Sequence, residues 1–141
     1  MAPVVVVTGL DHVVLTVADV ERSLGFYLDT LGLAGVRVEE WRRGEVPFPS
    51  VRIDATTIID LFPGDASGSS LDHLCLTVEP VDLAALAASG QVEVVRGPTD
   101  GLFGAQGFAT SLYLADPDGN TVELRNYSEN ETGVENETVA R

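Results

Sequence analysis

Two histidines, His12 and His73, are the only imidazoles in this chain, and they occupy equivalent positions of a repeated octapeptide. The first copy reads LDHVVLTV (residues 10–17) and the second reads LDHLCLTV (residues 71–78), with six of eight positions identical. Both copies are rich in β-branched residues and alternate as strands do. Because successive side chains of a strand point to opposite faces, the repeat predicts one imidazole on the same face of two equivalent strands.

Two carboxylates complete this pattern. Asp60 lies 48 residues after His12 in IIDLF (residues 58–62), and Glu123 lies 50 residues after His73 in TVELR (residues 121–125). Burying a carboxylate on a strand costs several kcal/mol unless the carboxylate is paired or binds a metal. Imidazole and carboxylate together suit one divalent ion of Mn, Fe, Co, Ni or Zn, with positions left open for a substrate. We therefore predict a catalytic metal site made of two histidines and one or two carboxylates, with His12, His73, Glu123 and Asp60 as the candidate ligands.

Each octapeptide begins a unit of one strand, one helix and three further strands. Helices are predicted at residues 18–33, where Asp19 is the expected N-cap, and at residues 79–90. The later strands are expected at residues 36–41, 50–54 and 56–62, and at residues 91–96, 110–115 and 120–127. A unit of about sixty residues has only a small core of its own, so the two units should pack as one α+β body. Alternation places His12 on the concave face, opposite the helix.

Composition and charge exclude several classes of function. With 22 acidic and 8 basic residues, the formal net charge of −14 disfavours nucleic-acid or membrane partners. All basic residues are arginine, which excludes a Schiff-base lysine and the lysine of a phosphate-binding loop. The single cysteine, Cys75, cannot form an intrachain disulfide, and the N-terminal segment lacks the features of a secretion signal. We expect a cytoplasmic protein with a disordered acidic tail at residues 128–141.

The chain resembles the vicinal oxygen chelate superfamily, which contains glyoxalase I, extradiol dioxygenases, methylmalonyl-CoA epimerase and bleomycin resistance proteins. The resemblance is carried by LDHVVLTVADVERSLGFYLDTLGL (residues 10–33), LDHLCLTV (residues 71–78) and SLYLADPDGNTVELRNY (residues 111–127). It implies a single domain, residues 1–127, in which two βαβββ modules (about 8–64 and 69–127) form a cup-shaped mixed sheet with helices on its outer face.

The resemblance also assigns roles to the repeated residues. His12, His73 and Glu123 match the usual metal ligands of the family, and Asp60 matches a fourth position that normally holds glutamate. The shorter side chain of Asp60 leaves its coordination open. The family further implies a homodimer, and the sequence does not decide whether the two histidines of one site come from one chain or from two.

Three functions follow from the resemblance. The first is a metal-dependent lyase or isomerase of the glyoxalase I or epimerase kind, which stabilises an enediolate of a substrate with adjacent oxygens while Glu123 or Asp60 transfers a proton. The second is an Fe(II)-dependent extradiol-type dioxygenase, disfavoured because the chain has no third histidine. The third is a metal-free dimeric protein that binds a drug or metabolite, disfavoured by the retained ligand pattern.

Further residues are candidates for contact with a substrate. Arg125 lies two residues after Glu123 and so shares its face, where it could hold a substrate anion or pair with Asp60. Tyr113 and Arg52 are also expected near the substrate. The glycine-rich segment RGPTDGLFGAQGF (residues 96–108) is expected to be a surface loop that closes over a ligand as a lid, and DPDGN (residues 116–120) is expected to be a hairpin turn.

Overall fold

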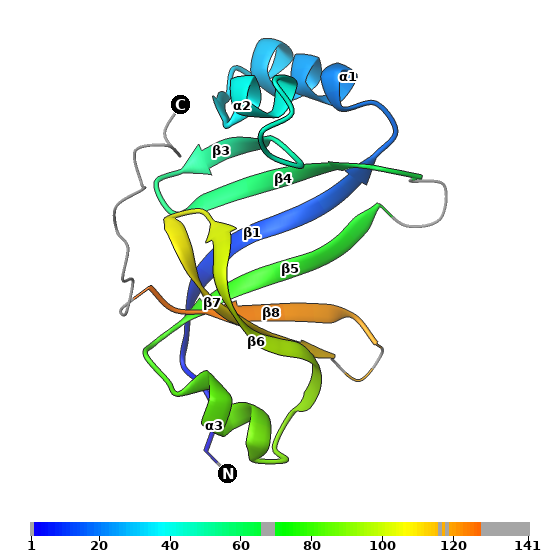
Figure 1. Ribbon diagram of the computed structural model, residues 1–141. Helices are drawn as coiled ribbons and strands as arrows, with labels where there is room; N and C mark the ends of the chain where they lie inside the picture. The colour runs from blue at the N-terminus through cyan, green and yellow to red at the C-terminus, as the bar shows by residue number, and fades with distance from the viewer. Residues whose placement is uncertain (1, 66–69, 116, 118, 128–141) are drawn as a thin grey trace.

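The computed structural model describes residues 2–65, 70–115, 117 and 119–127. In this part of the chain, eight strands form one open mixed sheet in the order β2-β3-β4-β1-β5-β8-β7-β6 (Figure 1). The first four strands are β1 Val7–Val17, β2 Ala34–Val36, β3 Ser50–Asp54 and β4 Thr57–Pro63. The other four are β5 Leu71–Val78, β6 Glu93–Gly104, β7 Gly107–Ala115 and β8 Thr121–Arg125. The mixed sheet with few helices confirms the predicted α+β class.

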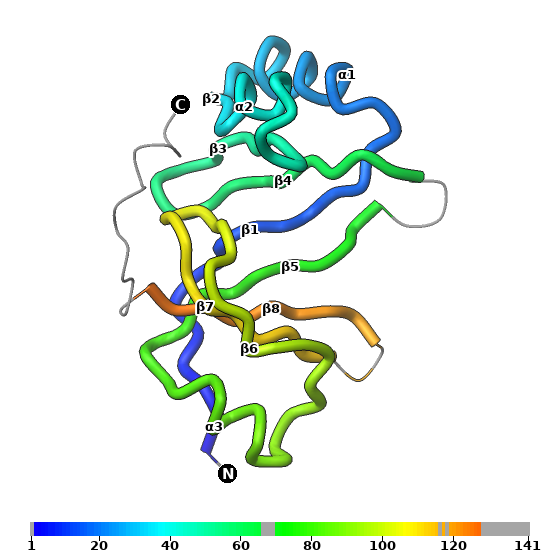
Figure 2. The backbone as a smooth tube through the Cα atoms, viewed as in Figure 1, coloured from blue at the N-terminus to red at the C-terminus, as the bar shows by residue number. Residues whose placement is uncertain are grey.

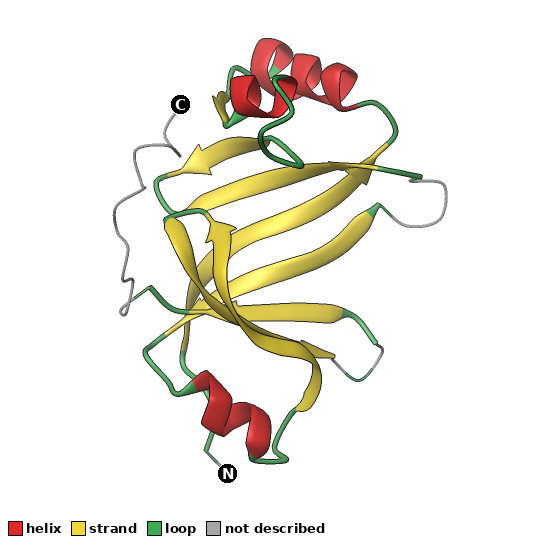
Figure 3. Ribbon diagram, in the orientation of Figure 1, coloured by secondary structure: helices red, strands yellow, loops and turns green. Residues whose placement is uncertain are grey.

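The two halves of the sheet have the same topology. In the first half β1 pairs in parallel with β4, and β3 joins β4 to β2 by antiparallel pairing. In the second half β5 pairs in parallel with β8, and β7 joins β8 to β6 in the same way. The halves meet where β1 and β5 run antiparallel, so the two octapeptides lie side by side at the centre of the sheet (Figure 3).

An aspartate is the N-cap of the helix that follows each octapeptide. Helix α1 (Val20–Leu24) starts after Asp19, whose side chain accepts a hydrogen bond from the backbone N–H of Arg22 at 3.0 Å. This satisfies one of the free N–H groups of the first turn and confirms the predicted N-cap. The chain continues as a π-helical turn, Gly25–Thr30. Helix α3 (Leu83–Ala88) starts after Asp82, which accepts from the N–H of Ala85 at 3.0 Å.

The helices and the candidate ligands lie on opposite faces of the sheet. Two clusters of buried apolar side chains hold the helices to it: Val20, Leu24, Val38, Val51 and Leu61 in the first half, and Val78, Leu83, Leu86, Leu112 and Leu124 in the second. Asp60 precedes Leu61 on β4, and Glu123 precedes Leu124 on β8. Strand alternation therefore turns both carboxylates away from the helices, as predicted.

The strand predicted at residues 36–41 is wrong in most of its length. Strand β2 ends at Val36, Arg37 adopts a left-handed conformation with φ 59°, and Val38–Arg42 form the short helix α2. Val38 and Trp41 both pack on the first apolar cluster, and a spacing of three residues brings them together on one side of a helical turn. The sequence VRVEEW alternates well enough to suggest a strand, but a left-handed residue interrupts the extended backbone.

The surface loop predicted at residues 96–108 is also wrong, because this segment forms most of a long β-hairpin, and its closure over a ligand as a lid stays a prediction. Strands β6 and β7 pair through several register shifts, and Gly97, Gly101 and Gly107 have positive φ angles of 100°, 71° and 112°. Glycine reaches such angles without steric cost, which lets the strands bend. The hairpin passes over the first half of the sheet (Figure 2), where the backbone N–H of Ala105 donates to Asp11 at 2.9 Å.

The remaining predictions about the chain concern its ends and turns. Gly119 has a φ of 85°, as the turn predicted at residues 116–120 requires, although residues 116 and 118 lie outside the described residues. The tail predicted at residues 128–141 also lies outside them. Among the described helices, none is long and apolar enough to cross a bilayer.

Candidate metal centre

His12 and His73 meet within one chain. Their strands are neighbours, with His12 opposite Cys75 and Val14 opposite His73 in the register of β1 and β5. The two imidazole rings stand nearly perpendicular, with centroids 5.6 Å apart and an interplanar angle of 78°. The antiparallel contact between the two halves therefore brings the duplicated histidines together, which the sequence alone left open.

An aspartate that precedes each histidine holds its ring in place. Asp11 and the Nδ1 atom of His12 are 2.7 Å apart, and Asp72 and the Nδ1 atom of His73 are also 2.7 Å apart. With Nδ1 engaged, the Nε2 atom of each ring remains to bind a metal, an arrangement that orients histidine ligands in many metal sites. Sequence reasoning missed both aspartates, although the repeated Asp of the LDH tripeptide was a signal that could have identified them.

Asp11 is the more deeply embedded of the two aspartates. It is fully buried, whereas Asp72 is 59% exposed. Besides His12, it accepts hydrogen bonds from the backbone N–H of Ala105 at 2.9 Å and from the Tyr127 hydroxyl at 2.7 Å. Burial opposes its ionisation, but the hydrogen bond to His12 and the charge of Arg125 outweigh burial and lower the pKa of Asp11. It is therefore a fixed negative charge behind His12.

Glu123 presents one carboxylate oxygen to both histidines. Its Oε1 atom lies 3.2 Å from Nε2 of His12 and 3.1 Å from Nε2 of His73. Its Oε2 atom accepts hydrogen bonds from the Ser111 hydroxyl at 2.7 Å and from Arg125 Nη2 at 2.9 Å. Burial opposes the charge of Glu123, but the hydrogen bonds to the two histidines and the charge of Arg125 outweigh it and lower the pKa of this carboxyl.

The converging atoms of His12, His73 and Glu123 fit a divalent ion. Their ligand atoms all lie within 4.8 Å of one another. Ligands bound at about 2.0–2.2 Å to an octahedral or tetrahedral ion are separated by roughly 3.0–3.5 Å, and the two histidine–glutamate separations of 3.2 and 3.1 Å match this. Nitrogen and carboxylate oxygen donors of this kind suit Mn, Fe, Co, Ni or Zn. The fully buried Cys75 lies near His12 and Asp11, and burial raises the pKa of its thiol to about 12 in the metal-free protein.

Asp60 stands beside this group and not within it. Its Oδ2 atom is 3.8 Å from Nε2 of His12, longer than the separation expected of adjacent ligands. Its Oδ1 atom accepts a hydrogen bond of 2.5 Å from the Ser50 hydroxyl, just as Ser111 holds Glu123 in the other half. Burial raises the pKa of Asp60, against the opposing charge of His12. Glu123 and Asp60 therefore occupy equivalent strands but differ in their readiness to take a proton.

These side chains open into a cavity of about 370 Å³. One part of its wall is apolar and consists of Val14, Phe48, Phe62, Leu102 and Phe103. Tyr113, a predicted substrate contact, lies in this cavity with its ring edge-on to His73 at a centroid distance of 5.5 Å. Arg96 lies at the opening, with its guanidinium carbon 4.1 Å from the centroid of the Tyr113 ring.

The structure places Arg125 and Arg52, two expected substrate contacts, outside the lining of the cavity. Arg125 is fully buried, and it binds Glu123, the hydroxyl of Tyr127 at 3.0 Å and the carbonyl oxygens of Leu102 and Phe103 at 3.2 Å. It therefore pairs with Glu123 and not with Asp60, and it has no exposed surface for a substrate. Arg52 donates to the carbonyl oxygens of Asp54 and Ala105, each at 2.9 Å, and does not line the cavity. Arg125 therefore holds Glu123 directly, whereas Arg52 is attached to the turn of the β6–β7 hairpin at Ala105.

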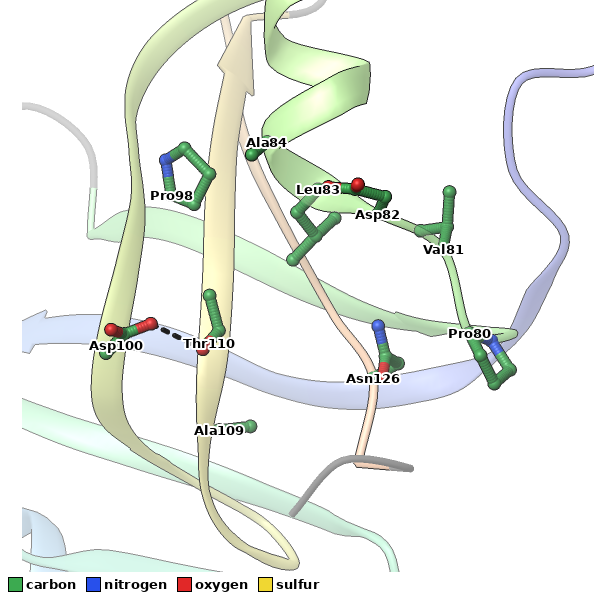
Figure 4. Close-up of a pocket in the computed structure, with 10 residues that line it drawn as sticks. All are labelled: Pro80, Val81, Asp82, Leu83, Ala84, Pro98, Asp100, Ala109, Thr110 and Asn126. Atoms are coloured by element: carbon green, nitrogen blue, oxygen red, sulfur yellow. Dashed lines mark hydrogen bonds between the residues drawn. The ribbon is translucent and has the colours of Figure 1, made fainter. Parts of the chain in front are cut away.

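A larger groove lies on another part of the molecule, between α3 and the outer strands of the second half (Figure 4). Its volume is about 670 Å³, and its lining consists of Pro80, Val81, Asp82, Leu83, Ala84, Pro98, Asp100, Ala109, Thr110 and Asn126. Asp82 caps α3, and Asp100 accepts a hydrogen bond from the Thr110 hydroxyl at 2.7 Å. Its two carboxylates are thus engaged in the fold, whereas the smaller cavity is lined by the converging side chains of His12, His73 and Glu123.

The sequence and the fold of this chain are similar to those of known proteins. The profile of the Glyoxalase/Bleomycin resistance protein/Dioxygenase superfamily matches residues 9–124. The virulence protein STM3117 of Salmonella typhimurium is 30% identical over 126 residues, which is 86% of each chain. Methylmalonyl-CoA epimerase from Mycobacterium tuberculosis has a similar fold, with a TM-score of 0.60 and 22% identity over 89% of this chain and 92% of the epimerase. A variant of homoprotocatechuate 2,3-dioxygenase from Brevibacterium fuscum has a TM-score of 0.64 and 22% identity, over 89% of this chain and 34% of the dioxygenase.

Proposed function

Because the chain belongs to the Glyoxalase/Bleomycin resistance protein/Dioxygenase superfamily, we propose that it is a metal-dependent lyase or isomerase of the glyoxalase or epimerase kind. Its substrate is a small molecule with two adjacent oxygens, and the reaction moves a proton at the neighbouring carbon. The observation that carries this proposal is the contrast between its two buried carboxylates, Glu123 and Asp60. One is suited to hold a cation and the other to exchange a proton.

His12, His73 and Glu123 would hold the ion. A divalent cation bound there supplies Lewis-acid stabilisation of negative charge on the oxygens of the substrate. Glu123 is poorly suited to accept a proton, because Ser111 and Arg125 donate to its second oxygen and its pKa is lowered. These same contacts keep Glu123 ionised and fixed, as a ligand should be.

Asp60 is the better general base and acid. Ser50 fixes its Oδ1 atom, and its Oδ2 atom lies on the side of His12 Nε2, at 3.8 Å, in the wall of the cavity. A catalytic base works best when its pKa approaches the working pH, and burial raises the pKa of Asp60 in that direction. The Oδ2 atom of Asp60 would accept the proton from the substrate carbon and return it to the product, so that no proton is gained or lost overall.

The separation of Asp60 from His12 also favours a second candidate. If only two histidines and one carboxylate bind the ion, the ligand set is the one typical of Fe(II) oxygenases. An extradiol-type dioxygenase acting on a catecholic substrate would use the same three ligands. In that reaction Asp60 has no required role as a base, and this difference separates the two candidates.

The substitution Asp60→Asn tests the proposal against the alternative. The protein is loaded in turn with Zn, Ni, Co, Mn and Fe(II), and each form is given thiohemiacetals of 2-oxoaldehydes, 2-substituted acyl thioesters and catechols. We expect product formation, or exchange of the carbon-bound proton with deuterium, that falls about 10²–10⁴-fold in Asp60→Asn while metal affinity changes little. Oxygen consumption with Fe(II) and a catechol that Asp60→Asn leaves intact would establish the dioxygenase. Failure of the purified protein to bind any of these ions would contradict both candidates and leave the metal-free binding protein.

A further inference from the structure

The positive charges of this acidic protein are mostly committed to its own acceptors. Among the described arginines, four are engaged in ion pairs or in hydrogen bonds to backbone oxygens: Arg42 with Glu21 and Glu39, Arg43 with Glu45, Arg52 with carbonyl oxygens, and Arg125 with Glu123. Arg96 is different, because it lines the candidate active-site cavity and forms no ion pair with any described carboxylate.

The position of Arg96 leaves its donors available to a ligand. The residue is exposed on β6, and its guanidinium lies on the Tyr113 ring at 4.1 Å from carbon to centroid. Stacking on a ring uses the face of the guanidinium, whereas the N–H groups that bind a carboxylate lie along its edge. Tyr113, which also forms a side-chain hydrogen bond with Arg96, therefore orients this arginine at the opening of the cavity and leaves the other N–H groups of its edge to a ligand.

A second arginine adds to the positive potential of the same cavity. Arg37 is only 8% exposed, and its guanidinium carbon lies 3.8 Å from the ring centroid of Phe103 and 5.0 Å from that of Phe48. Its Nε atom is buried and has no hydrogen-bond partner in the described part of the chain. Both phenylalanines line the cavity, so this charge lies directly against the apolar wall.

We propose that the substrate carries a carboxylate, bound by Arg96, about one aromatic ring away from its two adjacent oxygens. This inference rests on the proposed function, since it takes the adjacent oxygens to lie at His12, His73 and Glu123. Tyr113 sets the spacing, because its ring contacts both the His73 ring, at a centroid distance of 5.5 Å, and the Arg96 guanidinium, at 4.1 Å from carbon to centroid. The part of the substrate between the two ends is apolar, to match Phe48, Phe62 and Leu102.

The charges around the cavity explain why Arg96 selects a carboxylate and not a phosphate. With a net charge of −14 the protein repels anions in general, and Asp60, Asp72 and Glu123 line the same cavity. A dianionic phosphate would meet three carboxylates with one exposed arginine to offset them. A planar carboxylate carries one charge and matches the edge of a single guanidinium.

The inference can be tested on the full chain loaded with cobalt(II), whose visible absorption changes when a chelator binds. Benzohydroxamate offers two adjacent oxygens without a carboxylate, and its 3-carboxy and 4-carboxy derivatives add only that group. We expect at least one carboxylated probe to bind the wild-type protein about tenfold more tightly than benzohydroxamate. In Arg96→Gln that advantage should disappear, while affinity for benzohydroxamate stays within about twofold.

Arg22→Gln is the matched control, because it removes the same unit of charge from an exposed residue outside the cavity. This variant should keep the preference for the carboxylated probe. Equal binding of all three probes by the wild type, or an equal loss in both variants, would overturn the inference and leave the proposed function standing. If cobalt does not bind, or benzohydroxamate does not perturb bound cobalt, the proposed function fails and the inference fails with it.

Discussion

The buried aspartate behind His12 provides a sharp test of how this site is built. In Asp11→Asn the side chain keeps its shape but loses its charge, and an amide replaces one of two oxygens that accept hydrogen bonds. In the present structure those oxygens bind His12 at 2.7 Å, the N–H of Ala105 at 2.9 Å and the hydroxyl of Tyr127 at 2.7 Å. The substitution therefore weakens both the orientation of His12 and the attachment of the β6–β7 hairpin.

Asp72→Asn offers a matched comparison within the same molecule. Asp72 holds His73 by a contact of the same length, 2.7 Å, but it is 59% exposed while Asp11 is fully buried. Water can replace part of what Asp72 provides, whereas nothing replaces a buried acceptor. Loss of a carboxylate that orients a metal-binding histidine typically costs about 10–100-fold in metal affinity. We expect a loss in that range for Asp11→Asn and about threefold or less for Asp72→Asn.

Isothermal titration with zinc or cobalt would measure these affinities, and urea unfolding of the metal-free proteins would measure stability. Asp11→Asn should lower the free energy of unfolding by about 1–3 kcal/mol, and Asp72→Asn by less than about 0.5 kcal/mol. Equal effects of the two substitutions on metal affinity would refute the reasoning, since burial is the main difference between the two contacts. So would an unchanged affinity in Asp11→Asn.

Three further predictions concern the same site and its support. His73→Ala should abolish the rise in Tm caused by a divalent ion while the circular dichroism of the metal-free protein stays the same; a retained metal-dependent rise would exclude His73 as a ligand. Gly104→Ala should lower the free energy of unfolding by about 1–3 kcal/mol in urea titration, because an added Cβ would overlap the buried guanidinium of Arg125; an unchanged midpoint would contradict that packing. In the metal-free protein the pKa values of His12 and His73 are raised, because hydrogen bonds to Asp11, Asp72 and Glu123 outweigh burial. The positive charge of these histidines therefore stabilises the folded state fully below about pH 6.5. This stabilisation is lost as the pH rises through the raised pKa values. A metal needs the unprotonated nitrogens, so its apparent affinity should rise about tenfold per pH unit for each proton displaced between about pH 6 and pH 8; titration at several pH values would show this, and a falling affinity would contradict it.

Much of the site follows from short-range regularities of the sequence. A strand repeats every two residues, so alternation alone puts His12 and Asp60 on the face opposite the helices, and the structure has them there. The N-cap at Asp19 is equally local, because it depends on one side chain and the N–H three residues on. The repeat of the LDH tripeptide extends this further, since two copies of one strand predict two equivalent histidines.

Alternation gives the face of a side chain but not its distance from groups on other strands. Arg125 shares the face of Glu123 as expected, yet only the folded chain shows that its donors all end on protein acceptors. The cation at the opening of the cavity is instead Arg96, which reaches Tyr113 because the glycine-rich segment folds as a hairpin. Glycines that permit a loop permit a bent strand equally well, so local preference does not distinguish the two.

Periodicity and chemistry within short segments are enough to predict the class of fold, the duplicated strands and the residue types that can bind a metal. Only the folded chain shows that His12 and His73 of one chain meet, that Glu123 lies between them, and that Asp60 stands apart at 3.8 Å. These are contacts between strands 48 to 111 residues apart, and their distances depend on how the whole sheet twists and pairs.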